Sequence, residues 1–218
     1  MFGPGAVILI GELHGTVQIP AAVAALLEPL AHPIVLGIEW PSELQVAVDA
    51  YVAGAIDAAA LVATPSTFWA WRDGRSSEAM VALLARMRQR DVRVVCFDGA
   101  FEDPAMRDAG MAERFTAAVD TRAVNVALCG NLHARMANPR WMGWNVRERF
   151  PHAIALDAVS AGGTAWCTTD ERGPRAVTFR RDRAGTPGAI TLFEAPDERG
   201  FTGEIFVGPI DASPPVST

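Results

Sequence analysis

Five short apolar runs constrain the fold of this chain more than any other feature. Each run is bounded by turn residues, and alanine- and leucine-rich stretches lie between them. The runs are AVILIGE (6–12), PIVLGIE (33–39), VRVVCFD (92–98), AVNVALCG (123–130) and HAIALDAV (152–159). Nearly continuous apolar strands are typical of sheets covered on both faces, and their alternation with helices indicates parallel βα units. We therefore expect an α/β fold with a largely parallel central sheet flanked by helices on both faces.

The intervening stretches predict helices over residues 19–31, 42–60, 76–90, 103–119 and 138–149. The clearest is 76–90, where Met80, Leu83, Leu84 and Met87 follow helical spacing. Either Ser76 or Ser77 can cap its start.

Beyond about residue 160 the pattern changes to short alternating runs separated by turns, which predicts antiparallel strands. A chain of 218 residues is long enough for one sizeable core and short for two. We expect a single domain with a βα core over 1–160, an antiparallel extension over 161–210 and a frayed tail over 211–218.

The charge of the chain argues against one class of partner, nucleic acid. The chain has 19 basic and 25 acidic residues and no Lys/Arg cluster, so nucleic acid is not an expected partner. No apolar stretch approaches the roughly 20 residues of a spanning helix, and the N-terminus lacks a basic leader region. We expect a cytoplasmic protein, or a periplasmic one if a signal peptide was removed. Its expected partner is a small-molecule or peptide substrate, and its oligomeric state stays open.

Three cysteines, Cys96, Cys129 and Cys167, lie inside apolar strand-like runs. This placement indicates small buried hydrophobic residues rather than a disulfide framework or a paired metal motif.

Ionisable residues follow four of the five strands, and this is the main functional signal. Glu12 and His14 follow the first strand, Glu39 the second, Asp98 the third and His133 the fourth. Ligands of open α/β sheets bind beyond the carboxyl ends of the strands. Each residue alone fits a solvated strand end or a turn, but together they predict one shared pocket, which Asp157 of the fifth strand could also reach.

Two glycines reinforce this signal, because Gly11 and Gly130 each precede a histidine by three residues, in GELH and GNLH. A glycine at a strand end lets the chain turn sharply and lets a ligand approach the backbone.

The chemistry that these residues favour is hydrolysis of an ester or amide bond by activated water. His14, expected to be neutral at pH 7, would be the general base, oriented by Glu12 or Glu39. His133, Asp98 or the backbone amides of Gly130 and Asn131 could stabilise the oxyanion.

A second mechanism stays open, in which a divalent transition metal activates the water. Glu12, His14, Asp98 and His133 would then ligate Mn, Fe, Co or Zn, while Glu39 takes the proton.

Aromatic and basic residues near the pocket are the candidate substrate contacts. The main candidates are Asn131, Arg135, Trp40, Trp69, Trp71 and Arg72. Two aromatic stretches, 66–75 and 140–144, add Arg75, Trp141 and Trp144. The tryptophans could line the mouth for an apolar or cyclic substrate, with an arginine binding an anionic group. Core filling between helices and sheet is the equally open alternative.

The stretches ILIGELHGT, LGIEWP and CGNLHA resemble the superfamily of erythromycin esterases, ChaN-type haem-binding lipoproteins and TraB/TIKI metalloproteases. The resemblance covers about residues 5–160 and rests on the paired G-x-x-H motifs with two glutamates. It implies an EreA/ChaN-like fold and a pocket holding Glu12, His14, Glu39 and His133.

The branches of this superfamily imply different activities. The esterases imply that His14 activates water with the help of the glutamates, whereas the TIKI branch implies a divalent metal. The ChaN branch implies haem or another apolar ligand, but its tyrosine iron ligand has no clear match here, because the one tyrosine, Tyr51, lies in a helical stretch. A metal, haem and no cofactor all stay open, as does a scaffold that has lost its activity.

Overall fold

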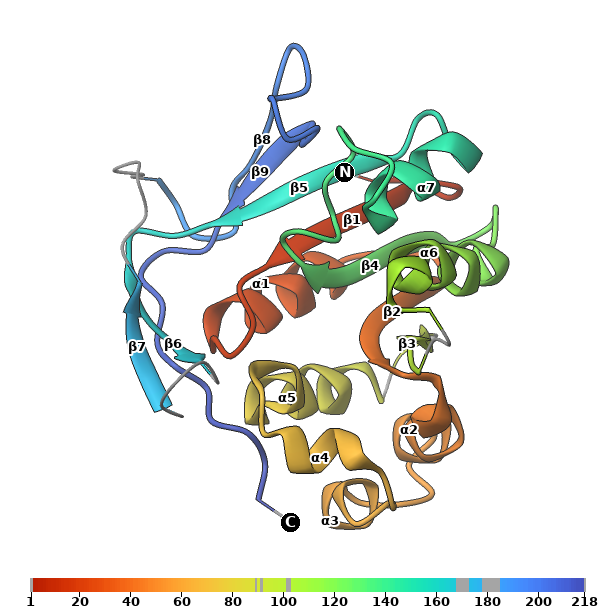
Figure 1. The fold of residues 1–218 in the computed structure, drawn as a ribbon, viewed down its shortest axis with the longest axis vertical. Coiled ribbons are helices and arrows are strands. Elements are labelled where there is room, and N and C mark those ends of the chain that lie inside the picture. The colour runs from red at the N-terminus through yellow and green to blue at the C-terminus, as the bar shows by residue number, and fades with distance from the viewer. Residues whose placement is uncertain are drawn as a thin grey trace.

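The centre of the fold is a sheet whose strands run in the order β3-β2-β4-β1-β5-β9-β8 (Figure 1). The computed structural model describes residues 2–88, 90, 92–100, 103–167, 173–177 and 185–217. The strands of this sheet are β1 (Val7–Glu12), β2 (Ile34–Pro41), β3 (Val92–Asp98), β4 (Val124–Gly130), β5 (Ile154–Val159), β8 (Ile190–Leu192) and β9 (Gly203–Phe206). All neighbours from β3 to β9 pair in parallel, and β8 pairs antiparallel to β9. The five apolar runs therefore form the predicted parallel strands.

Helices cover both faces of the sheet, as predicted. One apolar cluster joins the sheet to α1 (Gln18–Leu27), α2 (Gln45–Val52), α3 (Ala58–Val62), α4 (Thr67–Trp71) and α5 (Glu78–Met87). A second cluster joins its other face to α6 (Arg107–Ala118) and α7 (Met142–Arg149). Side chains of β1 alternate between the clusters, with Ile8 and Ile10 in the first and Val7 and Leu9 in the second, because successive strand residues point to opposite faces.

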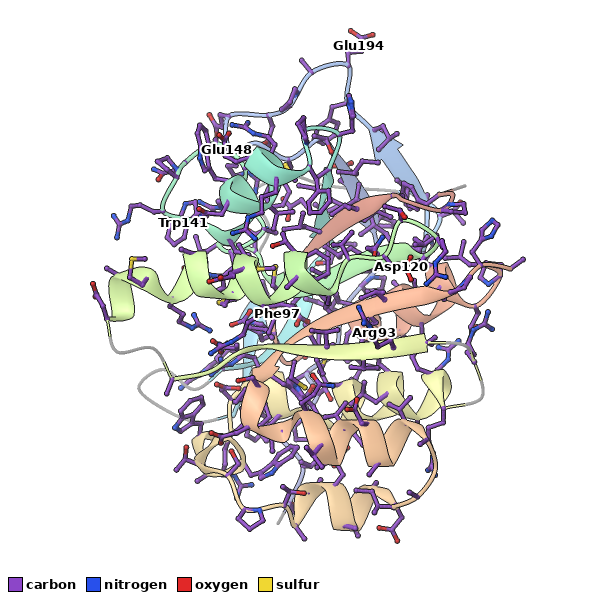
Figure 2. All side chains as sticks on the ribbon, turned by 90° about the vertical axis from the view of Figure 1, so that its right-hand side faces the viewer. Arg93, Phe97, Asp120, Trp141, Glu148 and Glu194 are labelled. Carbon is purple, nitrogen blue, oxygen red and sulfur yellow. The ribbon has the colours of Figure 1, made fainter. Side chains whose placement is uncertain are left out.

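The second cluster can be followed in Figure 2, where Phe97 of β3 lies below α6. Its ring centroid is 6.2 Å from that of Phe115 of α6. In the described ranges, no helix is long and apolar enough to cross a membrane.

The helix predicted over 42–60 is divided in the structure. A 3₁₀ turn, η1 (Ser42–Leu44), leads into α2, and α2 ends at Val52. Gly54 follows with a φ of 79°, a left-handed conformation that glycine adopts without a Cβ clash. Asp57 then caps α3 by accepting a hydrogen bond from the amide of Ala60. The prediction missed this break because the alanine-rich sequence around it is typical of a continuous helix.

The C-terminal region differs from the prediction in one strand and in its tail. β6 (Gly163–Cys167) and β7 (Gly173–Val177) form a separate antiparallel pair, but β9 joins the main sheet in parallel with β5. Part of the predicted antiparallel extension over 161–210 lies outside the described residues, at 168–172 and 178–184.

The tail predicted to fray is instead bound to the fold. The amide of Val17 donates to the carbonyl of Asp211 (2.9 Å), and the amide of Ser213 donates to the carbonyl of Gly15 (2.8 Å). The prediction was wrong because these partners lie far away in sequence.

The same tail also caps α5. Neither predicted cap, Ser76 or Ser77, makes a side-chain cap bond, although Ser77 occupies the N-cap position. The amide of Ala79 donates instead to the hydroxyl of Ser213 (3.0 Å), and the amide of Glu78 donates to the carbonyl of Pro214 (2.9 Å).

Candidate active site

The carboxyl edge of the sheet collects the predicted ionisable side chains. β1 and β4 pair so that Glu12 lies opposite Gly130, and β2 and β3 continue the sheet on the other side of β4. Glu12, Glu39 and Asp98 are buried there, and His14 and His133 lie in the loops that follow β1 and β4. The predicted convergence of these side chains is therefore present.

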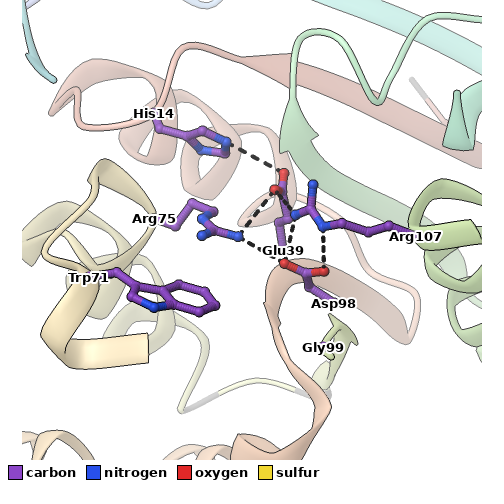
Figure 3. Close-up of a pocket in the computed structure, with 7 residues that line it drawn as sticks. All are labelled: His14, Glu39, Trp71, Arg75, Asp98, Gly99 and Arg107. Atoms are coloured by element: carbon purple, nitrogen blue, oxygen red, sulfur yellow. Dashed lines mark hydrogen bonds and ion pairs between the residues drawn. The ribbon is translucent and has the colours of Figure 1, made fainter. Parts of the chain in front are cut away.

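His14 lies between two carboxylates. Its Nδ1 is 3.0 Å from Glu12 Oε1. Its Nε2 is 3.5 Å from Glu39 Oε2 (Figure 3). Burial opposes the charged ring, but Glu12 and Glu39 outweigh it and raise the pKa of His14 from 6.5 to about 10. The prediction of a neutral His14 at pH 7 is therefore wrong: the neighbouring carboxylates make it an imidazolium.

Glu39 is a buried carboxylate that is held by both a backbone amide and a guanidinium. It accepts a hydrogen bond from the amide of Gly130 (2.7 Å) and one from Arg107 Nη2 (2.8 Å). Burial would raise the pKa of Glu39, but the charges of His14 and Arg75 are among the contacts that hold it well below the usual range. Glu39 is thus an anion that fixes the positions of its neighbours.

Two arginines link this group to Asp98. Arg107 donates from Nε (2.9 Å) and Nη2 (2.7 Å) to the two oxygens of Asp98, and Arg75 Nη1 donates to the same carboxylate (2.8 Å). Arg75 is in turn held by Asp73, which accepts from its Nε (3.0 Å) and Nη2 (2.6 Å). Both guanidinium groups are therefore paired with protein carboxylates and not free for an anionic substrate group.

His133 forms a dyad with Asp108. Its Nδ1 is 2.7 Å from Asp108 Oδ1, which also accepts the amide of Met142 (2.8 Å). Its Nε2 is 3.0 Å from Arg107 Nη1. Because a guanidinium can only donate, Nε2 must accept, and this assigns the neutral ring with its proton on Nδ1. The two histidines thus have opposite protonation states.

Sequence reasoning missed Arg107 and Asp108 as site residues. Both lie in the first turn of α6, soon after the end of β3. A helix that follows a parallel strand begins at the edge of the sheet where that strand ends. Polar residues in the first turn of the helix predicted over 103–119 could therefore have been included among the site candidates.

Two cavities meet at His14. One, of about 430 Å³, is lined by His14, Glu39, Trp71, Arg75, Asp98, Gly99 and Arg107 (Figure 3). The other, of about 450 Å³, is lined by Glu12, Leu13, His14, Asp73, Gly74, Gly130, Asn131, Leu132, His133, Trp166 and Cys167. His14 is the residue that both share.

Gly130 keeps the space between the histidines open. A Cβ at this position would lie 2.9 Å from His14 Nε2 and 3.4 Å from both Glu39 Oε2 and His133 Cδ2. Any side chain here would displace the groups that face it.

The predicted substrate contacts divide between cavity and core. Trp71 borders the first cavity and is 48% exposed, with Arg75 at 5.2 Å from its ring centroid. Trp40 and Trp69 are 0% and 4% exposed and pack against Phe68. For these two tryptophans the core alternative is correct, because they fill the space between sheet and α4.

The remaining predicted contacts have different surroundings. Arg72 ends α4 in a left-handed conformation (φ 51°) and borders neither cavity. Asn131 borders the second cavity and is held by Asp157 and by Arg135 Nη2 (3.2 Å). Arg135 therefore does not border the cavity itself but donates a hydrogen bond to Asn131, which does.

Two further predicted tryptophans lie beyond the cavity linings. Trp141 is edge-on to His133, with 6.3 Å between ring centroids, and Trp144 stacks with Arg147.

The backbone amides proposed for the oxyanion are already used. The amide of Gly130 donates to Glu39 (2.7 Å), and that of Asn131 donates to the carbonyl of Glu12 (2.9 Å). An oxyanion would have to be stabilised by side chains instead.

The arrangement does not fit the predicted metal ligands. In the part of the chain that the structure describes, no group of three or more His, Cys, Asp or Glu side chains is placed to hold a metal ion. Asp98 is paired with Arg75 and Arg107, and His133 Nε2 accepts from Nη1 of the same Arg107. Asp98 and His133 therefore face cations of the protein itself, which does not fit their predicted role as metal ligands.

The cysteines and the tyrosine are not placed as ligands either. Cys96 and Cys129 are buried, as predicted, and burial raises the pKa of both thiols. Cys167 is half-buried and borders the second cavity. Tyr51 is buried in α2 and borders neither cavity, so it is not positioned as a haem ligand for this cleft.

Several solved structures have a similar fold at low sequence identity. The structure is similar to that of a Bacillus cereus protein solved as a structural-genomics target, with a TM-score of 0.69. The two sequences are 10% identical, and the match covers 99% of this chain and 91% of that chain. A succinoglycan biosynthesis protein from the same structural-genomics programme is 9% identical and has a TM-score of 0.72 over 97% and 90%. The fold is EreA/ChaN-like.

The type III effector HopBA1 is also similar, with 14% identity and a TM-score of 0.50 over 94% of this chain and 88% of that chain. No family model matches the sequence, and no curated protein matches it. At these identities the likeness establishes the EreA/ChaN-like fold alone.

Proposed function

We propose that this protein is a hydrolase that activates water against an ester or amide bond in the cleft around His14 and His133. The observation that carries the proposal is the position of two histidines beside Gly130, His14 between two carboxylates and His133 with its Nε2 facing Arg107 Nη1. Such a pair supplies both proton transfers that hydrolysis requires, one from water and one to the leaving group.

His133 is the proposed general base. In the proposed step its Nε2 takes a proton from water, and the hydroxide oxygen forms a bond to the carbonyl carbon. Asp108 holds the Nδ1 proton and stabilises the imidazolium that results. Arg107 Nη1 must leave Nε2 when water arrives, because one lone pair cannot accept from both.

His14 is the proposed general acid, in place of the base role expected from the sequence. The carbonyl oxygen becomes an oxyanion near the His14 imidazolium and Arg107 Nη1, which has left His133 Nε2. Among the described residues, Nη1 is the one nitrogen of this guanidinium that does not donate to a carboxylate. The bond to the leaving group then breaks. His14 Nε2 gives its proton to the departing oxygen or nitrogen, and Glu12 keeps the ring oriented through Nδ1. Proton return from His133 to His14 through water restores the starting state.

The experiment is a panel of neutral ester and amide substrates assayed with the wild-type protein, His14→Gln and His133→Gln. His152→Gln is the matched control, because His152 is exposed on a loop. We expect each cleft variant to lower kcat/KM by about 10²-fold or more and the control to retain it. Equal activity in all four proteins, or activity in none, would overturn the proposal.

The same protein samples discriminate the metal and haem alternatives. A chelator is expected to leave the rate unchanged, because the proposed proton transfers use protein groups only. Loss of activity with EDTA and its recovery with Mn, Co or Zn would favour the metal mechanism. A Soret band on adding hemin, lost in His14→Gln, would favour a binding protein instead.

A further inference from the structure

The two cavities that meet at His14 differ in chemical character. The first is lined by Glu39, Asp98, Arg75 and Arg107, with Trp71 as its aromatic wall (Figure 3). In the second, Leu13, Leu132, Trp166 and Cys167 face the same space as the histidines. A group bound at His14 therefore has a charged cavity on one side and a more apolar one on the other.

The apolar side includes a large, half-exposed side chain. Leu132 is 47% exposed, although it lies between two residues of the site, Asn131 and His133. Trp166 donates its indole N–H to the carbonyl of Arg72 (3.2 Å), which satisfies the polar edge of the ring and leaves its carbon atoms to line the cavity. Apolar surface of this kind gains free energy when a ligand removes it from water.

The charged side does not select an anion. Arg75 is paired with Asp73 and Asp98, and Arg107 is paired with Glu39 and Asp98. A carboxylate or phosphate of a substrate would have to break these pairs and would meet the remaining carboxylates. A neutral polar group can bond to the same edge at lower cost.

We propose that the substrate is a neutral ester or amide with an apolar acyl chain, which binds along Leu132 and Trp166, and a polar, uncharged remainder, which binds beside Trp71. This inference rests on the proposed function, because it places the scissile bond at His14. The cavity of about 450 Å³ is within the range of small-ligand sites, so it accommodates a medium-length chain.

The test is a chain-length series of p-nitrophenyl acetate, butyrate, hexanoate and octanoate. For the wild type, kcat/KM is expected to rise about fourfold per added methylene until the cavity is filled. Leu132→Ser is expected to reduce the octanoate-to-acetate ratio of kcat/KM at least tenfold. Leu192→Ser is the matched control, because Leu192 is a similarly exposed leucine (57%) on β8 that borders neither cavity, and it is expected to keep the wild-type ratio.

A binding measurement separates this inference from the proposed function. Calorimetric titration with 2-butanone, 2-hexanone and 2-octanone, which cannot be hydrolysed, measures the apolar cavity alone. Tighter binding of the longer ketones, weakened in Leu132→Ser but not in Leu192→Ser, would support the cavity even if no ester is turned over. Ester turnover that is independent of chain length, or binding that is unchanged in Leu132→Ser, would overturn the inference and leave the hydrolase proposal standing.

Discussion

At the scale of single residues, neighbouring charges determine what each histidine can do. His14 has carboxylates at both ring nitrogens. His133 has Asp108 at Nδ1, but its Nε2 is closer to the guanidinium of Arg107 (3.0 Å) than to Glu39 (3.7 Å). The same side chain is therefore a stable cation in one position and a neutral acceptor in the other. Neither state follows from the sequence motif G-x-x-H, which is the same for both.

The Asp108–His133 dyad gives the first prediction. Asp108→Asn removes the acceptor that holds the proton on Nδ1 of His133, so the ring can adopt the wrong tautomer. We expect kcat to fall by about 10²- to 10⁴-fold while the fold is retained. Asp57→Asn is the control, because Asp57 is an exposed helix cap and asparagine can also cap. Equal rates for the two variants would contradict the role of Asp108.

The raised pKa of His14 gives a prediction about pH. Its protonated form is favoured in the folded state, so its contribution to stability is fully present below pH 6.5 and is lost as the pH rises through about 10. Glu12→Gln removes one of the two carboxylates and should move this loss to lower pH. Free energies of unfolding from urea titration at several pH values measure it, with NMR of the imidazole as an independent readout. An unchanged His14 titration in Glu12→Gln would refute the assignment.

At the scale of elements, parallel strands with one common carboxyl edge assemble the site. β4 contributes to it in two ways, since its last residue donates an amide to Glu39 and also lacks a side chain where the histidines meet. The strand end thus sets both the position of Glu39 and the free space between the two histidines.

Gly130→Ala tests this space. The added methyl group would lie 2.9 Å from His14 Nε2, so the imidazole must move. Because small displacements of reacting groups are costly, we expect kcat/KM to fall by about 10²-fold. Gly3→Ala is the control, since a Cβ at Gly3 meets nothing within 4 Å. Similar kcat/KM values for both variants would show that the space is not used.

At the scale of the whole molecule, the C-terminal residues connect two of the loops that contribute to the site, the loop of His14 and the loop of Arg75. The carbonyl of Gly15, next to His14, accepts the amide of Ser213, and the carbonyl of Ser76, next to Arg75, accepts the amide of Val216 (2.9 Å). A Cβ at Gly74 would lie only 2.3 Å from the amide nitrogen of Gly15, so the two loops are in direct contact beneath the tail. The tail therefore fixes the loops relative to each other.

Ser213→Ala measures this connection. It removes the hydroxyl that caps α5 and is expected to lower the free energy of unfolding by about 1 kcal/mol. Ser217→Ala, at an exposed position of the same tail, should change it by less than about 0.5 kcal/mol. Thermal and urea unfolding of both variants provide the measurement, and equal stabilities would mean that the tail does not cap the helix.

The sequence by itself determined the layered α/β architecture and the edge at which the polar residues meet. Both depend on local patterns, namely apolar runs of strand length and the residues that end them. The positions of Glu12, Glu39, Asp98 and the two histidines at one edge follow from that pattern alone.

Only the tertiary structure decided how these residues are paired. Several of these contacts join separate segments of the chain: the pairing of Arg75 with Asp98, the Asp108 partner of His133, the packing of Trp40 and Trp69, and the attachment of the tail. Such contacts depend on packing and on the local balance of charge, and no periodicity along the chain encodes them. His14, predicted as a neutral base, has a raised pKa because Glu39 of a separate strand adds its charge to that of the nearby Glu12.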